Sequence, residues 1–245
     1  RVLMGDTARD TVWKRLAELL VETWTHASGA AMPLVRFALD TGFATQEAYA
    51  FVRACRDSRV MAVKGVPRGA ALIGTPTAID VSQGGKKLRR GIKVYTVAVS
   101  IAKLEFYNNL RKSADVGEDG LTTMFPAGFV HLPKIDAEFI QQLCAEQLIT
   151  RRDRNGFPVR EWQKMRERNE ALDCYVYARA AASAAGLDRF EERHWRELER
   201  QLGLASPPVP ETPTESISEA TQRGGFAVSG NRNTGRRVIK SRWLS

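Results

Sequence analysis

The sequence has few of the residues that zinc and redox sites use. Its 245 residues include only three cysteines, Cys55, Cys144 and Cys174, and three histidines. The cysteines form no C-x-x-C pair, which argues against structural zinc and favours a reducing compartment. The histidines are far from one another in the sequence, so a histidine-rich metal site is not expected either.

Several common motifs are also absent. No run of about 18 apolar residues occurs, so no membrane span is expected, and residues 1–6 lack the anatomy of a signal peptide. The sequence contains no G-x-x-x-x-G-K-[ST] loop, G-x-S-x-G elbow, H-E-x-x-H pair or dinucleotide fingerprint. Nothing therefore indicates an ATP-binding loop, a serine hydrolase or a zinc protease. The chain does not start with methionine, and we expect it to be an excerpt of a longer protein.

Positive charge is what the sequence has in excess. There are 37 Lys and Arg against 28 Asp and Glu, a formal net charge of +9. Such a surplus favours polyanionic partners, because Lys and Arg neutralise the phosphates of nucleic acids. A cationic surface that only maintains solubility is the alternative. The content of 43% hydrophobic and 27% charged residues is ordinary for a soluble globular protein.

The pattern of apolar residues predicts an α/β fold. Short apolar runs that end in polar turns are typical of buried strands, and apolar residues three and four apart are typical of helices. Their alternation indicates a mixed, partly parallel sheet flanked by helices. We expect strands at residues 34–39, 60–65 and 93–99, a short extended piece at 129–132, and helices at 7–26, 45–56, 101–111, 136–147, 166–185 and 189–202.

Turn and capping signals refine this prediction. Asn155-Gly156 between two short apolar segments predicts a β-hairpin, and Thr45 and Asp136 are expected to cap the helices that follow them. Residues 67–91, rich in Gly, Pro and basic side chains, and residues 113–120 are expected to be exposed loops. The Pro-, Ser-, Thr- and Gly-rich residues 204–245 predict a disordered basic tail, which leaves residues 1–203 as the folded domain.

Asp40 is the first candidate functional residue. It directly follows the apolar run at 34–39 and precedes Thr41-Gly42. The ends of strands in open α/β sheets are where ligand sites gather, because the loops diverge there and leave a crevice. An aspartate before Thr-Gly is also a common turn former. Both interpretations stay open on the sequence alone.

Asp173 is the second candidate, in the longest predicted helix. Glu170 lies three residues before it and hence on a neighbouring position of the same face. A semi-buried acid is costly unless it is paired with a cation or a metal, so an ion pair with one of the many arginines is the alternative. Together, Asp40 and Asp173 predict a two-metal Mg²⁺ or Mn²⁺ site for phosphodiester cleavage, in which water is activated and the leaving oxygen stabilised.

These segments, in order, resemble the C-terminal nuclease region of lambda-like (GpA) phage terminase large subunits. The resemblance covers about residues 5–186, and its last motif is the most specific. The motifs are F-A-L-D-T-G at 37–42 followed by Q-E-A-Y-A-F-V at 46–52, A-V-K-G at 62–65, V-A-V-S-I-A-K at 97–103, and R-N-E-A-L-D-C at 168–174.

The resemblance implies an RNase H-like fold and a metal-dependent endonuclease that cuts concatemeric double-stranded DNA during packaging. Asp40 resembles the second acid of the metal site and Asp173 the third. The first acid is expected on a strand upstream of residue 1, so both the strand and part of the site are expected to be missing here. Lys103, in a family-like segment, is an expected accessory residue that could contact DNA or the scissile phosphate, and Glu170 is expected to be an accessory or structural acid.

The expected partners follow from the same resemblance. They are double-stranded DNA, the terminase small subunit and the portal protein, the last through the tail, and the expected location is the host cytoplasm. One alternative is a non-catalytic DNA- or portal-docking module whose acids form salt bridges. Another is a different RNase H-like enzyme, such as a transposase or resolvase. The residues expected to hold DNA are Lys64, Lys86, Lys87, Arg89 and Arg90.

Overall fold

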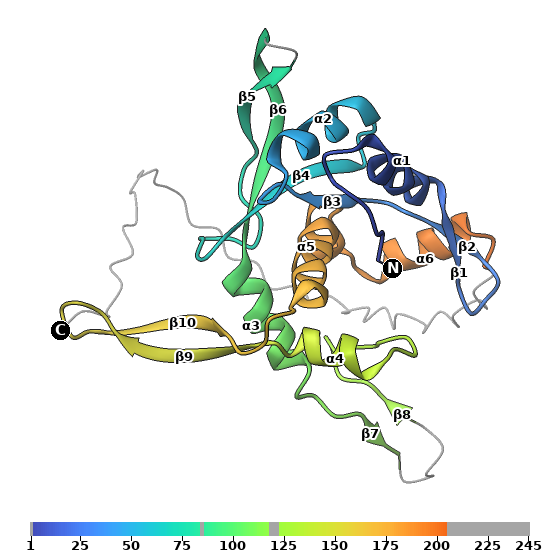
Figure 1. The fold of residues 1–245 in the computed structure, drawn as a ribbon. Helices are drawn as coiled ribbons and strands as arrows, with labels where there is room; N and C mark the ends of the chain where they lie inside the picture. Colours follow the sequence, from blue (N-terminus) through green and yellow to red (C-terminus); the bar gives the residue numbers. More distant parts are fainter. Residues whose placement is uncertain (1, 84–85, 118–122, 205–245) are drawn as a thin grey trace, which may run out of the picture. The chain divides into compact units, whose positions relative to one another are not determined.

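A computed structural model describes residues 2–83, 86–117 and 123–204 of the chain. Its central sheet has the strand order β3-β4-β6-β5 (Figure 1). Strands β3, β4 and β6 are parallel, and β5 is antiparallel to β6. The expected mixed α/β sheet flanked by helices is therefore confirmed. The strands span Phe37–Asp40 (β3), Val60–Val66 (β4), Thr77–Gln83 (β5) and Lys86–Ala98 (β6).

Helices α2 (Thr45–Cys55) and α5 (Glu170–Ala184) cover opposite faces of this sheet. Successive side chains of a strand point to opposite faces. Ala62 of β4 accordingly packs in a cluster with Tyr49 of α2, whereas the next residue, Val63, packs in a cluster with Val176 of α5. The predicted helix at 45–56 is confirmed, but its N-cap is Ala44, with no side-chain cap.

A second cluster fixes the beginning of α5. Phe106 of α3 (Val99–Asn109) and Leu172 of α5 are both fully buried there, beside Leu143 at the end of α4 (Ala137–Leu143). Asp136 caps α4 as predicted, since its Oδ1 accepts the backbone N–H of Phe139 at 2.8 Å. The helix ends at Leu143 rather than near residue 147, because the chain enters a strand at Glu146.

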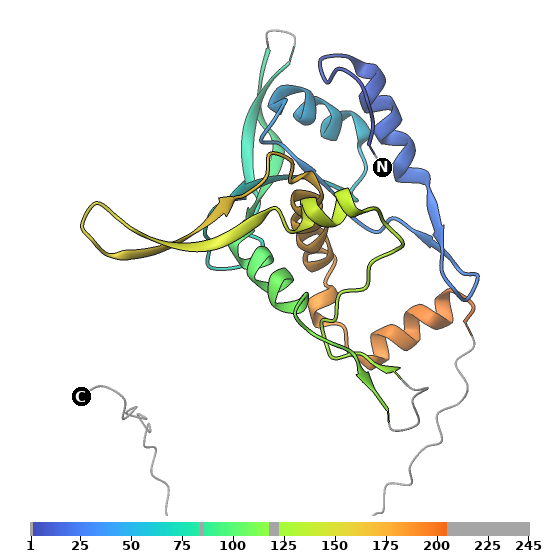
Figure 2. The same cartoon turned by 60° about the horizontal axis from the view of Figure 1, so that its bottom comes forward.

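That strand, β9 (Glu146–Arg152), forms a hairpin with β10 (Pro158–Lys164) over seven residue pairs. The turn contains Asn155-Gly156 as predicted, and Gly156 has φ +83°, a conformation that favours glycine. Both views show the hairpin extending away from α3 and α5 (Figures 1 and 2). The predicted helix at 166–185 starts later, at Glu170, because β10 continues to Lys164.

The predicted helix at 7–26 is wrong in its second half. Helix α1 spans Asp10–Glu18 and a 3₁₀ turn spans Leu19–Val21. The chain then forms β1 (Thr23–Thr25), which pairs with β2 (Ala31–Pro33). Apolar spacing continued into this segment, but the β-branched threonines and the turn at residue 29 favour a hairpin.

The predicted loop at 67–91 is wrong as well, because β5 and the first part of β6 lie in it. The two strands pair from Thr77↔Val94 to Gln83↔Lys86. Val81 and Ile92 are buried with Tyr49 in the cluster under α2, so burial of this hairpin outweighs the loop-like composition.

The remaining differences are local. In the predicted loop at 113–120, β7 (Asp115–Val116) pairs with β8 (Thr123–Met124), and no strand forms at 129–132. Helix α6 spans Glu192–Gln201 within the predicted range. Within the described residues, no helix combines the length and apolarity needed to cross a bilayer. The predicted tail, apart from its first residue, lies outside the described residues, so its disorder stays a prediction.

Candidate active site

Asp40 lies at the carboxyl end of β3, on the side that faces α5. Ala38, two residues earlier, packs against the α5 cluster, and residues two apart on a strand share a face. The carboxylate is exposed and its Oδ1 accepts the backbone N–H of Gly42 at 3.0 Å. Asp40 therefore does form a turn, and this turn fixes its carboxylate at the sheet edge.

Asp173 lies in the first turn of α5, opposite this edge. Asn169, which precedes the helix, donates from Nδ2 to Asp173 Oδ2 at 3.2 Å. Partial burial raises the pKa of the Asp173 carboxyl, the ammonium of Lys103 opposes this shift, and the carboxylates of Glu146 and Asp40 reinforce it. The two predicted acids are thus close enough for their charges to interact.

Glu146 is a third acid at this site, and it was not among the residues predicted from the sequence. It is 7% exposed at the start of β9, and both of its oxygens lie 2.7 Å from the Nζ atom of Lys103. Asn169 Nδ2 also donates to Glu146 Oε1 at 3.1 Å. Asn169 thereby links the buried pair to Asp173. No local signal marked Glu146, because its partner is 43 residues away in the sequence.

Lys103 is only 6% exposed, so its ammonium faces Glu146 rather than the surface. In this arrangement it contacts a carboxylate and can affect a substrate phosphate only through its charge. Its position beside Asp173 fits the expected accessory role better than direct DNA binding.

Tyr177 is the other site residue that was not predicted from the sequence. Burial raises the pKa of its hydroxyl, as do the charges of Asp40 and Asp173 and a hydrogen bond to Asp40. A Cβ atom on Gly65 of β4 would lie 2.8 Å from the Tyr177 hydroxyl, so only glycine leaves room for it. The sequence did contain a signal for Tyr177, because it lies four residues after Asp173, and residues four apart on a helix are neighbours on its surface.

A groove of about 660 Å³ lies between β3 and α5, with Asp40 and Tyr177 among its lining residues. Most of the other lining side chains are apolar, including Ala178 and Ala182 of α5. The carboxylate of Asp40 therefore borders a space that is open to a ligand. Strand β3 is also the edge strand of the sheet in the described part of the chain.

The donor set of this site suits a hard cation. Mg²⁺ prefers oxygen ligands and is usually held by one or two carboxylates together with water and substrate phosphates. Asp40 and Asp173 supply two carboxylates, while Glu146 is already bound to Lys103. No group of three His, Cys, Asp or Glu in a metal-binding arrangement occurs among the described residues. Asp40 and Asp173 therefore fit a metal site in which they supply two ligands and other groups supply the rest.

The other predicted site residues differ in their surroundings. Glu170 is exposed at the start of α5, where its Oε2 is 3.4 Å from the Nε atom of Arg168. Lys64 is exposed, but it shares a face of β4 with Ala62 and therefore lies on the α2 side of the sheet. Arg89 is an exposed residue of β6. The side chains of Lys86, Lys87 and Arg90 lie outside the described residues, although their backbone belongs to β6.

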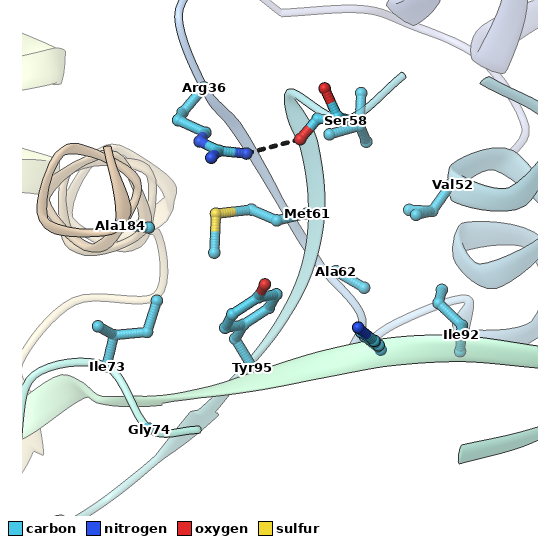
Figure 3. Close-up of a pocket in the computed structure, with 12 residues that line it drawn as sticks. Arg36, Val52, Ser58, Met61, Ala62, Ile73, Gly74, Ile92, Tyr95 and Ala184 are labelled. Atoms are coloured by element: carbon cyan, nitrogen blue, oxygen red, sulfur yellow. Dashed lines mark hydrogen bonds between the residues drawn. The ribbon is translucent and has the colours of Figure 1, made fainter. Parts of the chain in front are cut away.

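A second cavity, of about 340 Å³, lies at the amino ends of β3 and β4, whereas Asp40 lies at the carboxyl end of β3 (Figure 3). It reaches Ala184 at the end of α5, whereas Asp173 is in the first turn of that helix. Arg36 at its rim donates to the carbonyl oxygen of Ser58 at 2.6 Å. No carboxylate lines this cavity, so it does not compete as a metal site.

Similarity to known proteins agrees with this geometry. The terminase large subunits of Escherichia phage lambda and Enterobacteria phage P21 are each 29% identical to the chain, over 187 and 183 residues. Each match covers 74% of this chain but only 27% of the relative, so the chain spans about a quarter of their length. No solved structure matches significantly. A family model described as the endonuclease domain of the terminase large subunit gpA matches residues 1–195. The chain therefore belongs to the family of terminase large subunit gpA endonuclease domains.

Proposed function

We propose that this chain is the nuclease region of a phage DNA-packaging terminase and hydrolyses phosphodiester bonds of concatemeric double-stranded DNA. The observation that carries the proposal is the position of Asp40 at the carboxyl end of β3 and of Asp173 in the first turn of α5, the helix that packs against this strand. Membership of an endonuclease-domain family supports the same reaction class. The net charge of +9 is suited to a polyanionic substrate.

In this proposal Asp40 and Asp173 bind Mg²⁺ or Mn²⁺ at a two-metal site. Such cations, when bound, supply a more acidic water and neutralise charge on the leaving oxygen. The N–H of Gly42 holds the carboxylate of Asp40, the Tyr177 hydroxyl lies beside it, and Asn169 holds the carboxylate of Asp173. Lys103 adds a positive charge beside Asp173 and keeps Glu146 neutralised.

The proposal includes an RNase H-like arrangement with a further acid. Strand β3 has no second neighbour among the described strands. In lambda-like terminases the first acid of the site is expected on a strand upstream of residue 1. Such a strand would fit along the free edge of β3 and would bring its acid beside Asp40. The activity is therefore best measured in a terminase polypeptide that includes the residues preceding this chain.

The test is DNA cleavage by Asp40→Asn and Asp173→Asn variants of that polypeptide, with Mg²⁺ or Mn²⁺ and with EDTA. We expect either substitution to abolish metal-dependent cleavage while the circular dichroism spectrum stays unchanged. Glu170→Gln is the matched control, because it removes an exposed acid one turn from Asp173 and is expected to leave cleavage intact. Undiminished cleavage by Asp173→Asn contradicts the proposal.

The partners belong to the proposal too. We propose that the chain acts in the host cytoplasm with the terminase small subunit and that residues 204–245 contact the portal protein. A non-catalytic docking module is the rival function. It predicts DNA binding that depends steeply on salt and no cleavage with any divalent metal.

A further inference from the structure

The β9–β10 hairpin begins and ends at the carboxylate site. Its first residue is Glu146, the buried partner of Lys103, and its last is Lys164, which pairs with Glu146 across the two strands. Asn169 Nδ2 donates to Glu146 Oε1 at 3.1 Å and to Asp173 Oδ2 at 3.2 Å, so the base of the hairpin lies beside Asp173. A ligand bound along the hairpin would therefore extend toward the proposed catalytic acids.

The base of the hairpin is fixed to α3. The Tyr107 hydroxyl donates to the carbonyl oxygen of Leu143 and accepts the backbone N–H of Glu146. The Tyr107 ring stacks on Trp162 of β10, with centroids 5.3 Å apart. On the other side, Arg68 of the segment after β4 donates to the carbonyl oxygen of Arg160 at 3.0 Å. These contacts hold the direction of the hairpin relative to Asp173.

The two faces of the hairpin differ in charge. Directly paired residues, and residues two apart on one strand, share a face. One face therefore carries Lys164, Arg160 and Arg152, which pair with Glu146, Thr150 and Pro158, and between Lys164 and Arg160 it also carries Trp162, which stacks on Tyr107. All three cations are exposed, and no ion pair to any of them is found within the described part of the chain. We call these three residues the basic strip.

The opposite face is neutralised. It carries Arg151, whose Nη1 lies 2.8 Å from Oε1 of Glu161. Arg151 and Arg152 are thus neighbours in the sequence but lie on opposite faces, and only Arg151 forms an ion pair with an acid among the described residues. Among the described residues of the hairpin strands, the face that continues from Glu146 is the one whose cations form no ion pair.

The length of the basic strip suits a DNA backbone. From Lys164 to Pro158, the partner of Arg152, there are six residue steps of about 3.4 Å, or ~20 Å in total. This length corresponds to about six base pairs of duplex at ~3.4 Å each. A two-stranded ribbon is also narrow enough to enter the major groove.

We propose that the basic strip, Lys164, Arg160 and Arg152, binds the phosphate backbone of duplex DNA that leads to Asp40 and Asp173. This inference rests on the proposed nuclease function for its substrate. It assigns the DNA contact to the β9–β10 hairpin, in addition to the residues that the sequence analysis selected.

The test measures binding without cleavage. The affinity of the chain for a labelled 30-bp duplex is determined by fluorescence anisotropy over a range of NaCl concentrations in EDTA. The slope of log affinity against log salt is negative, and each lost phosphate contact is expected to reduce its magnitude by about 0.9. Arg160→Gln and Arg152→Gln should each lower the slope by this amount, and the double variant by about twice as much. Arg151→Gln, on the neutralised face, should leave it unchanged.

Two further variants guard against indirect effects. Arg152 donates to the carbonyl oxygen of Gly156, so its loss could loosen the turn, whereas no such side-chain bond is found for Arg160 within the described residues. Arg160→Gln is therefore the decisive single variant. The Arg152→Lys/Arg160→Lys variant keeps both charges and should restore the slope.

The outcomes separate this inference from the nuclease proposal. An unchanged slope in the double glutamine variant, or an equal loss in Arg151→Gln, overturns the basic strip even if Asp173→Asn abolishes cleavage. A reduced slope supports the strip even if no metal-dependent cleavage is found, in which case only the nuclease proposal fails.

Discussion

Lys103 and Glu146 are buried against each other, with the Nζ atom 2.7 Å from both carboxylate oxygens, beside the candidate catalytic Asp173. Removing one member of a buried ion pair leaves an uncompensated charge and typically costs about 3–5 kcal/mol. We therefore expect Lys103→Met to lower the free energy of unfolding by about this amount, measured by urea denaturation.

The double variant Lys103→Met/Glu146→Leu provides the control. Replacing a whole buried pair with apolar residues is often nearly neutral, so it should recover much of the stability lost in Lys103→Met. Additive losses in the double variant would show that the two side chains do not stabilise each other.

Asp173→Asn should make the metal-free protein more stable at neutral pH. The pKa of Asp173 is raised in the folded state, chiefly by burial, so the folded chain binds this proton more tightly than the unfolded chain. The stability from this group is therefore present below the unfolded pKa of about 3.9 and is lost as the pH rises through the folded value. Each kcal/mol regained at pH 7 corresponds to about 2–4 °C in Tm.

The measurement is the Tm of both proteins in EDTA as a function of pH. The advantage of Asp173→Asn should be largest near neutral pH and should shrink as Asp173 becomes protonated in acid. Added Mn²⁺ should stabilise only the protein that retains Asp173. A variant less stable than the parent at pH 7 would refute this account of Asp173.

Tyr177→Phe tests whether the Tyr177 hydroxyl, which lies beside Asp40, orients that carboxylate. Losing a residue that orients a metal ligand typically costs about 10- to 100-fold in metal affinity or activity. We therefore expect the Mn²⁺ concentration that half-activates DNA cleavage to rise by a factor in this range. Tyr175→Phe is the matched control on the same helix, because Tyr175 packs against Phe106, with ring centroids 4.0 Å apart. Equal effects of the two substitutions would argue against a specific role for Tyr177.

Gly65→Ala should act on the same contact from the sheet side. The added methyl group would lie 2.8 Å from the Tyr177 hydroxyl and 3.1 Å from Cγ1 of Val99. The hydroxyl must then shift from its position beside Asp40, and we expect cleavage to fall about as far as in Tyr177→Phe. In the Tyr177→Phe background the hydroxyl is gone, and Gly65→Ala should add little. Strictly multiplicative losses in the double variant would show that the two residues act independently.

Phe106→Ala tests the packing that positions the first turn of α5. Phe106 is fully buried together with Leu172, the residue before Asp173. Truncation of a buried phenylalanine costs about 3–5 kcal/mol, which urea denaturation would measure. Leu104→Ala, at a residue 40% exposed on the same helix, should cost much less.

The sequence by itself determined the features that depend on neighbouring residues. The apolar run before Asp40 predicted a strand end, and a short polar side chain at Asp136 predicted a helix cap. The Asn155-Gly156 turn predicted the hairpin, because glycine adopts the positive φ that the turn requires. The same local patterns selected Asp40 and Asp173, whose charges the fold brings within reach of each other.

Only the tertiary structure decided which distant residues meet. Residues 86–91 have a loop-like composition, yet they extend β6 because Val81 and Ile92 can be buried under α2. Glu146 carries no local signal, and it joins the site because Lys103 and Asn169 approach it from two other segments. The choice of Arg152 over Arg151 depends in the same way on strand register. Local propensity fixes an element, but burial and register fix which of its faces meets a partner, and for Asp40 and Asp173 that is what forms the candidate site.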